Sequence, residues 1–241
     1  GHLALSLEDG HGYNIAIGAS ALSVQNAGAD AYNIAIGYSS GFATSTGIQN
    51  TFVGSATGAF HTTGNNNTFL GYESGKSNTL ARLTGADNTA VGCKAGTLLQ
   101  GVAANNTLVG SSSGAAVTTG SQNTALGYKA AFSNVTSNDV TAIGYQSNFF
   151  NTSAGATVVG SNAGVYNNSG ANSTFIGFQA GQGIDGTRLT GDNNTAVGKD
   201  AGLLLQGAAN SNTLIGATAG DSLTIGELNT VVGMAALATD D

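Results

Sequence analysis

The chain contains no proline among its 241 residues and a single cysteine, Cys93. Proline cannot donate to a strand ladder, so its absence is typical of a chain built from paired strands and tight turns. A single cysteine excludes an intrachain disulfide, and we expect Cys93 to be a small buried residue. No apolar run approaches the roughly 20 residues that a membrane-spanning helix needs, so we expect no insertion into a membrane.

Charge is also scarce. Only 8% of the residues are Asp, Glu, Lys or Arg, and the formal net charge is −7. Such a surface lacks the basic footprint that nucleic acids or anionic lipids require, so we expect neither as a partner. A hydrophobic content of 41% argues against a disordered chain, which is the other class that a polar, glycine-rich sequence suggests.

What the chain has in abundance is a short motif of the form Asn-Thr-apolar-aliphatic-Gly, which recurs in thirteen copies, ten of them with the Asn and eleven with the Thr. Successive copies of the motif glycine are 16 to 21 residues apart, most often 17. The motif glycines are Gly18, Gly37, Gly54, Gly71, Gly92, Gly110, Gly127, Gly144, Gly160, Gly177, Gly198, Gly216 and Gly233. This period predicts an all-β parallel β-solenoid, or β-roll, of about 13 coils, in which each coil contacts mainly its neighbours.

The motif predicts a short strand with two apolar faces. The residue before the glycine is always Ile, Val or Leu, as in Ile36, and the residue before that is also apolar, as in Ala35. Neighbouring strand residues point to opposite faces. One face therefore lines the coil, and we expect the other face to meet a second chain, which makes the protein an obligate oligomer. A further apolar patch later in each repeat predicts a second short strand.

The ends of the chain break the pattern. Leu3, Leu5 and Leu7 alternate with more polar residues, which predicts a first strand ending near Asp9. We expect residues 1–12 to be a lead-in whose first two residues are a remnant of an expression tag, 13–237 to form one solenoid domain, and 238–241 to be a tail.

A longer repeat is superimposed on the short one. The motif glycines from Gly54 onward recur at an offset of 106 residues, beginning with Gly160. Arg82 to Gly85 returns in the same way as Arg188 to Gly191. The chain therefore contains a tandem duplication, and its two 21-residue coils carry longer loops.

Repeats of the form Asn-Thr-(Ala/Phe)-(Val/Ile)-Gly resemble those of trimeric phage tail fibres and related surface fibres. Asn14 to Gly18 and Val140 to Gly144 are also similar to the repeats of YadA-like heads of trimeric adhesins. The resemblance covers Tyr13 to Leu237. It implies an intertwined or side-by-side homotrimer of left-handed parallel solenoids, located on a virion tail or an extracellular surface fibre, that takes part in host or prey recognition.

Binding residues are expected where the repeat is interrupted, because loops on a rigid scaffold carry function. The candidates are Glu73, Lys76, Arg82, Asp87, Asp185, Arg188, Asp192, Phe149 and Phe150. The charged residues fit either a sugar or surface-polymer site or salt bridges that hold the long loops. The two phenylalanines fit either stacking on sugars or packing in the core or at the trimer interface.

Enzymatic chemistry has little support in the sequence. No histidine lies near a set of Cys, Asp or Glu with metal-ligand spacing, and the calcium-loop fragment at Gly183 to Gly186 is not followed by a repeated acidic ladder. We expect no enzyme, no cofactor and no metal. The predicted function is a structural and adhesive fibre segment that attaches to cell-surface glycans or envelope. The alternatives are a shaft or spacer without a ligand, a trimeric polysaccharide depolymerase and an ice-binding protein.

Overall fold

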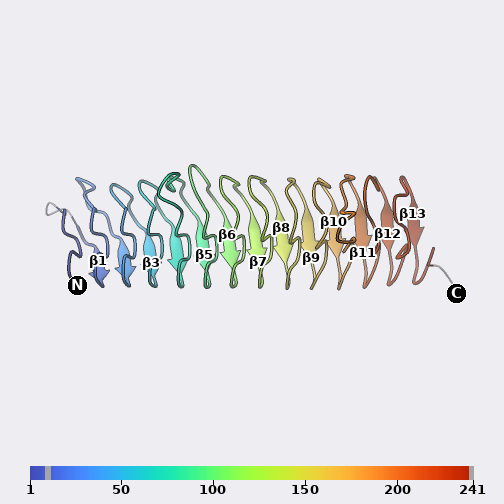
Figure 1. Ribbon diagram of the computed structural model, residues 1–241, viewed down its shortest axis with the longest axis horizontal. Helices are drawn as coiled ribbons and strands as arrows, with labels where there is room; N and C mark the ends of the chain where they lie inside the picture. The colour runs from blue at the N-terminus through green and yellow to red at the C-terminus, as the bar shows by residue number, and fades with distance from the viewer. Residues whose placement is uncertain (9–11, 239–241) are drawn as a thin grey trace. The chain divides into compact units, whose positions relative to one another are not determined.

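The structure is a computed structural model that describes residues 1–8 and 12–238. Over these residues it contains thirteen β-strands of three residues each, one per repeat (Figure 1). The strands are β1 (Ile15–Ile17), β2 (Ile34–Ile36), β3 (Thr51–Val53), β4 (Thr68–Leu70), β5 (Thr89–Val91), β6 (Thr107–Val109), β7 (Thr124–Leu126), β8 (Thr141–Ile143), β9 (Thr157–Val159), β10 (Thr174–Ile176), β11 (Thr195–Val197), β12 (Thr213–Ile215) and β13 (Thr230–Val232). In the described part of the chain, no helix is long and apolar enough to cross a membrane.

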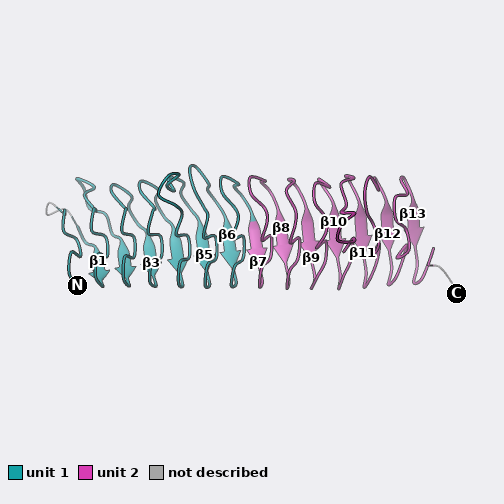
Figure 2. Cartoon of the chain, viewed as in Figure 1, with its two compact units in different colours: residues 1–123 teal, residues 124–241 magenta. Residues whose placement is uncertain are grey.

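The predicted solenoid is confirmed: the chain is an all-β parallel β-solenoid of about 13 turns with a period near 17 residues. Pairing between strands is parallel and places equivalent motif residues side by side, as in Thr51 with Thr68 and Phe52 with Phe69. The chain forms two compact units, residues 1–123 and 124–241 (Figure 2). Unit 1 contains β1–β6 and unit 2 contains β7–β13.

The core of each unit lies inside its turns. The middle residue of almost every strand is buried, and the largest of these are Phe52 and Phe69 in unit 1 and Phe175 in unit 2. Removing such a side chain from water stabilises the fold by about 1.5–3 kcal/mol. Because the middle residues stack in register, Phe52 and Phe69 also contact each other, with ring centroids 5.6 Å apart.

The motif glycine is required by close approach between turns. Gly54 has φ of +136°, and a Cβ there would lie 2.7 Å from the carbonyl oxygen of Gly71. No side chain fits such a stack, because the backbone carbonyl of Gly71 is too close and cannot move aside. Close stacking of successive turns therefore requires a glycine once in each turn, which explains the period of the glycines.

The asparagine that precedes most strands forms a buried ladder. In unit 1, each ladder residue after Asn14 directs its backbone N–H to the side-chain oxygen of the asparagine one turn earlier. In unit 2 the buried residues Val140 and Ala156 occupy this position, and the ladder restarts where the backbone N–H of Asn194 donates to Ser173 Oγ. The asparagines therefore join successive turns through hydrogen bonds inside the solenoid.

Two predictions of strand structure are wrong. In the described residues each turn has one strand, and the predicted second strand is replaced by turns and isolated bridges. The reason is local: Ala56 and Gly58, in the turn after β3, have φ of 55° and 57°, and left-handed residues curl the backbone away from an extended path.

The predicted strand near the start is also absent, since residues 2–7 form turns and Leu3 and Leu7 are exposed. This segment packs against the next turn in the same way as the residues that follow a motif glycine. The backbone N–H of Ser20 donates to His2 O, and the backbone N–H of Leu5 donates to Ala21 O. The predicted end of the strand at Asp9 lies outside the described residues, as does most of the predicted tail at 238–241.

Candidate functional site

The first feature of interest is the outer sheet face, defined here as the first and third residues of the strands within each unit. The first position carries Thr in most strands, and the third carries Ile, Val or Leu in all of them. These residues are partly or fully exposed, for example Ile36 at 37% in unit 1 and Leu126 at 47% in unit 2. The prediction that both strand faces are apolar is confirmed, because the middle residue points inward and the third points outward.

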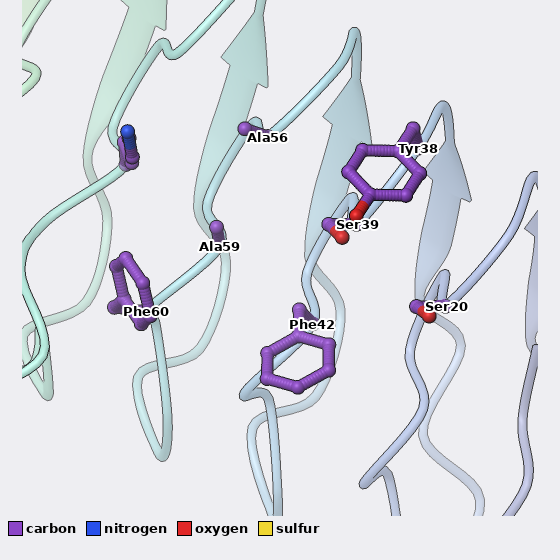
Figure 3. Close-up of a pocket in the computed structure, with 8 residues that line it drawn as sticks. Ser20, Tyr38, Ser39, Phe42, Ala56, Ala59 and Phe60 are labelled. Carbon is purple, nitrogen blue, oxygen red and sulfur yellow. The ribbon is translucent and has the colours of Figure 1, made fainter. Parts of the chain in front are cut away.

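A second feature is a pocket in unit 1, which we call the aromatic pocket. It has a volume of about 330 Å³. It is lined by Ser20, Tyr38, Ser39, Phe42, Ala56, Ala59, Phe60 and Lys76. Figure 3 shows Tyr38 and Phe42 on the turn after β2, and Ala56, Ala59 and Phe60 on the turn after β3.

The pocket exists because small residues interrupt a row of larger ones. Five residues after the motif glycine, successive turns carry Phe42, Ala59 and Lys76, and all three line the pocket. The duplicated turn in unit 2 carries Val165 where unit 1 has Ala59, and Asn162 where unit 1 has Ala56. Larger residues therefore occupy the equivalent positions of the second copy.

The predicted residue Lys76 lines this pocket and forms an ion pair with the predicted residue Glu73. Lys76 Nζ lies 2.6 Å from Glu73 Oε1, and this hydrogen bond is the main reason that the pKa of Glu73 is lowered. The two remaining candidates of the first long loop lie elsewhere. Arg82 is exposed and does not line the pocket, and Asp87 accepts a hydrogen bond from Asn66 Nδ2 over 3.2 Å.

The second long loop forms a shallow polar hollow of about 580 Å³ in unit 2. The predicted residues Asp185 and Arg188 line it, with Arg188 Nη2 3.5 Å from Asp185 Oδ1. The guanidinium carbon of Arg188 lies 3.8 Å from the ring centroid of Phe150. This stacking holds Arg188 against the surface, whereas its duplicate Arg82 is exposed. Asp192 Oδ1 accepts the backbone N–H of Ala171 over 2.8 Å, so this residue holds the loop.

The predicted pair Phe149 and Phe150 belongs to a run of stacked rings. Phe132 stacks on Phe149 with centroids 5.0 Å apart, Phe149 meets Phe150 edge-on at 4.5 Å, and Phe150 stacks on Tyr166 at 5.6 Å. The rings therefore pack on one another and are only partly buried, so they lie outside the core.

The sequence contains a signal for these aromatic rows, namely their distance from the motif glycine. Phe42, Phe132 and Phe149 all lie five residues after a motif glycine, so their alignment follows from the register alone. The same register corrects the expectation for Cys93, which is exposed rather than buried. It directly follows its motif glycine, a position at which Tyr38 and Tyr72 are also exposed.

Among residues 1–8 and 12–238, no group of three or more His, Cys, Asp or Glu could hold a metal ion. The fold defines the chain as a parallel β-solenoid repeat protein. A scan against known protein families and searches of curated proteins and of solved structures give no significant match.

Proposed function

We propose that the chain is a structural and adhesive segment of a homotrimeric fibre, in which the outer sheet faces of three copies pack together. The observation that supports this proposal is the exposed aliphatic row on the outer face of each unit. Monomeric soluble proteins rarely leave a long apolar surface in contact with water. A second copy of the chain is the natural cover, because a repeating surface matches its own spacing turn for turn. The number three comes from the resemblance to trimeric fibres.

Attachment to surface glycans or envelope, outside the cell or on a virion, is the proposed role of this fibre. A stiff trimer presents each binding pocket three times, and multivalency raises the apparent affinity without any new contact. The aromatic pocket of unit 1 and the polar hollow of unit 2 both include residues of the long duplicated loops. Both are therefore placed where a fibre can present them repeatedly along a surface.

The trimer is tested by the mass of the purified full chain in light scattering with size-exclusion chromatography. We expect a mass of about three times the 23.6 kDa chain. A monomer at micromolar concentration, with the solenoid intact by circular dichroism, overturns the proposal, because the outer face would then be stable in water without a cover.

The alternatives give different results in the same preparation. A trimer that binds no glycan is a shaft or spacer. Release of reducing ends from a polysaccharide identifies a depolymerase. Thermal hysteresis identifies an ice-binding protein, for which the threonine row of the outer face is the relevant surface.

A further inference from the structure

We propose that the aromatic pocket of unit 1 binds a neutral pyranose unit of a polysaccharide. This inference rests on the proposed attachment to glycans and assigns it to a defined site. A pyranose has two apolar C–H faces and a rim of hydroxyl groups. It therefore needs an aromatic wall together with a few hydrogen-bonding groups, in a pocket of at least about 300 Å³. The aromatic pocket, at about 330 Å³, meets these requirements.

The ring faces in this pocket are available to a ligand. Tyr38 is 64% exposed and Phe42 is 38% exposed. Among the described residues, neither ring stacks on another aromatic ring, and the same holds for Phe60. The faces of aromatic rings carry negative charge density, and the C–H bonds of a sugar present the weakly positive surface that complements it.

In unit 2, the rings at the positions of Phe42 and Phe60 pack against other aromatic rings. Phe149 occupies the position of Phe42, five residues after its motif glycine, and is covered by Phe132. Tyr166 occupies the position of Phe60 and stacks on Phe150. In unit 1, rings at the same two positions border a pocket, and Ala59, directly before Phe60, lines it as well. Rings at these two positions of the repeat therefore border a pocket in unit 1 and stack on other rings in unit 2.

The polar side of the pocket favours a neutral sugar over an acidic one. Lys76 is the charged residue in the lining, and Glu73 already neutralises its ammonium group at 2.6 Å. An ammonium group has three donors, so Lys76 keeps donors for sugar hydroxyls while the pair carries no net charge. The hydroxyls of Ser20 and Ser39 add donors and acceptors to the lining.

The duplication supplies a variant that closes the pocket with residues the fold already accepts. In Ala56→Asn/Ala59→Val, each new side chain is the one that unit 2 carries at the equivalent position. Ala56 has φ of 55°, a conformation that asparagine tolerates better than alanine. We expect the melting temperature to be maintained and glycan binding to fall by about tenfold or more, since 1.4 kcal/mol of lost contact corresponds to a factor of ten.

The probe is an array of neutral oligosaccharides of glucose, galactose, mannose and N-acetylglucosamine, with uronic- and sialic-acid oligosaccharides beside them. We expect the wild-type chain to bind neutral members, Phe42→Ala and the double variant to lose binding, and Arg82→Ala to retain it as the matched control. A silent array, binding confined to acidic members, or unchanged binding by the folded double variant overturns the pocket assignment. The mass of the assembly is measured in parallel. If the chain is a trimer but the array is silent, the pocket assignment fails while the fibre proposal stands.

Discussion

The side-chain amide of Asn67 donates to Oδ1 of Asn50 over 3.1 Å, and the backbone N–H of Asn67 donates to the same oxygen over 2.9 Å. The two residues are 17 positions apart and fully buried. One carbonyl oxygen therefore satisfies a backbone and a side-chain donor of the next turn. The ladder explains why asparagine precedes the strand so regularly, since a buried donor without an acceptor costs about 1–3 kcal/mol.

We predict that Asn67→Ala lowers the free energy of unfolding by about 2–4 kcal/mol. The substitution removes the acceptor for both Asn88 donors. It also removes the Asn67 amide, which bonds to Asn50 and to Gly85 O. Urea unfolding at fixed protein concentration measures the change. Asn14→Ala is the control: Asn14 is partly exposed and accepts only the backbone N–H of Asn33 within the ladder, so about 1 kcal/mol is expected. Equal losses in the two variants would contradict the ladder as a source of stability.

Replacement of a motif glycine tests the close approach between turns. Gly71 has φ of +120°, and a Cβ there would lie 2.7 Å from Gly92 O. We predict that Gly71→Ala costs about 2–5 kcal/mol, from backbone strain together with overpacking. Gly28→Ala is the matched control, because Gly28 also has positive φ but has no atom within 4 Å of an added Cβ. It should cost only about 1–2 kcal/mol, and a comparable melting temperature for the two variants would refute the steric explanation.

His61 predicts a pH dependence of stability. It is fully buried beside Phe52, and desolvation lowers its pKa from 6.5 to about 3. Its Nε2 lies 3.1 Å from the amide nitrogen of Asn67, which can donate only to a neutral ring. The unfolded state therefore binds a proton below pH 6.5 that the folded state does not, and stability falls as the pH decreases from 6.5 towards 3. The slope reaches about 1.4 kcal/mol per pH unit.

The control for this pH dependence is His61→Asn, because Asn167 occupies the equivalent position in unit 2. Unfolding free energies at pH 7, 5 and 4 should fall less steeply for the variant than for the wild-type chain. Parallel pH profiles would show that His61 titrates normally in the folded state.

The fold followed from the sequence because a single spacing determines it. Gly54 and Gly71 are 17 residues apart, and this spacing recurs within a few residues along the chain, so that within each unit each motif glycine stacks on the next. The second strand could not be predicted correctly in this way. Its apolar residues look like a strand, but left-handed residues such as Ala56 precede them. Alanine gives no sign in a sequence that it adopts this conformation.

The candidate site was only partly predictable for a different reason. The interruption of the repeat identifies Lys76 from the sequence, and a salt bridge that holds the long loop, such as its ion pair with Glu73, is one of the roles the sequence predicts. The pocket itself depends on the contrast in size between Phe42 and Ala59, one turn apart. That contrast becomes visible only when residues 17 positions apart are placed side by side.

The inner and outer residues of one strand should respond differently to substitution. Phe69 is the buried middle residue of β4, whereas Leu70 next to it is exposed on the outer sheet face. We predict that Phe69→Ala lowers the free energy of unfolding by about 3–5 kcal/mol, because it leaves a cavity in the core. Leu70→Lys combined with Ile36→Lys should leave the circular dichroism spectrum of the solenoid unchanged. It should reduce the mass in light scattering towards that of one chain, because unpaired cations would be buried between copies.

Leu80→Lys combined with Val102→Lys controls for added charge, since it adds the same two charges at residues that are 97% and 74% exposed and lie outside the strands. This variant should keep the mass of the wild-type assembly. If the Ile36/Leu70 variant also keeps that mass, the outer sheet face is not the contact between copies. If both charge variants dissociate equally, net charge rather than position decides assembly. Only dissociation confined to the Ile36/Leu70 variant agrees with three chains held together through this face, because the added charge differs only in location.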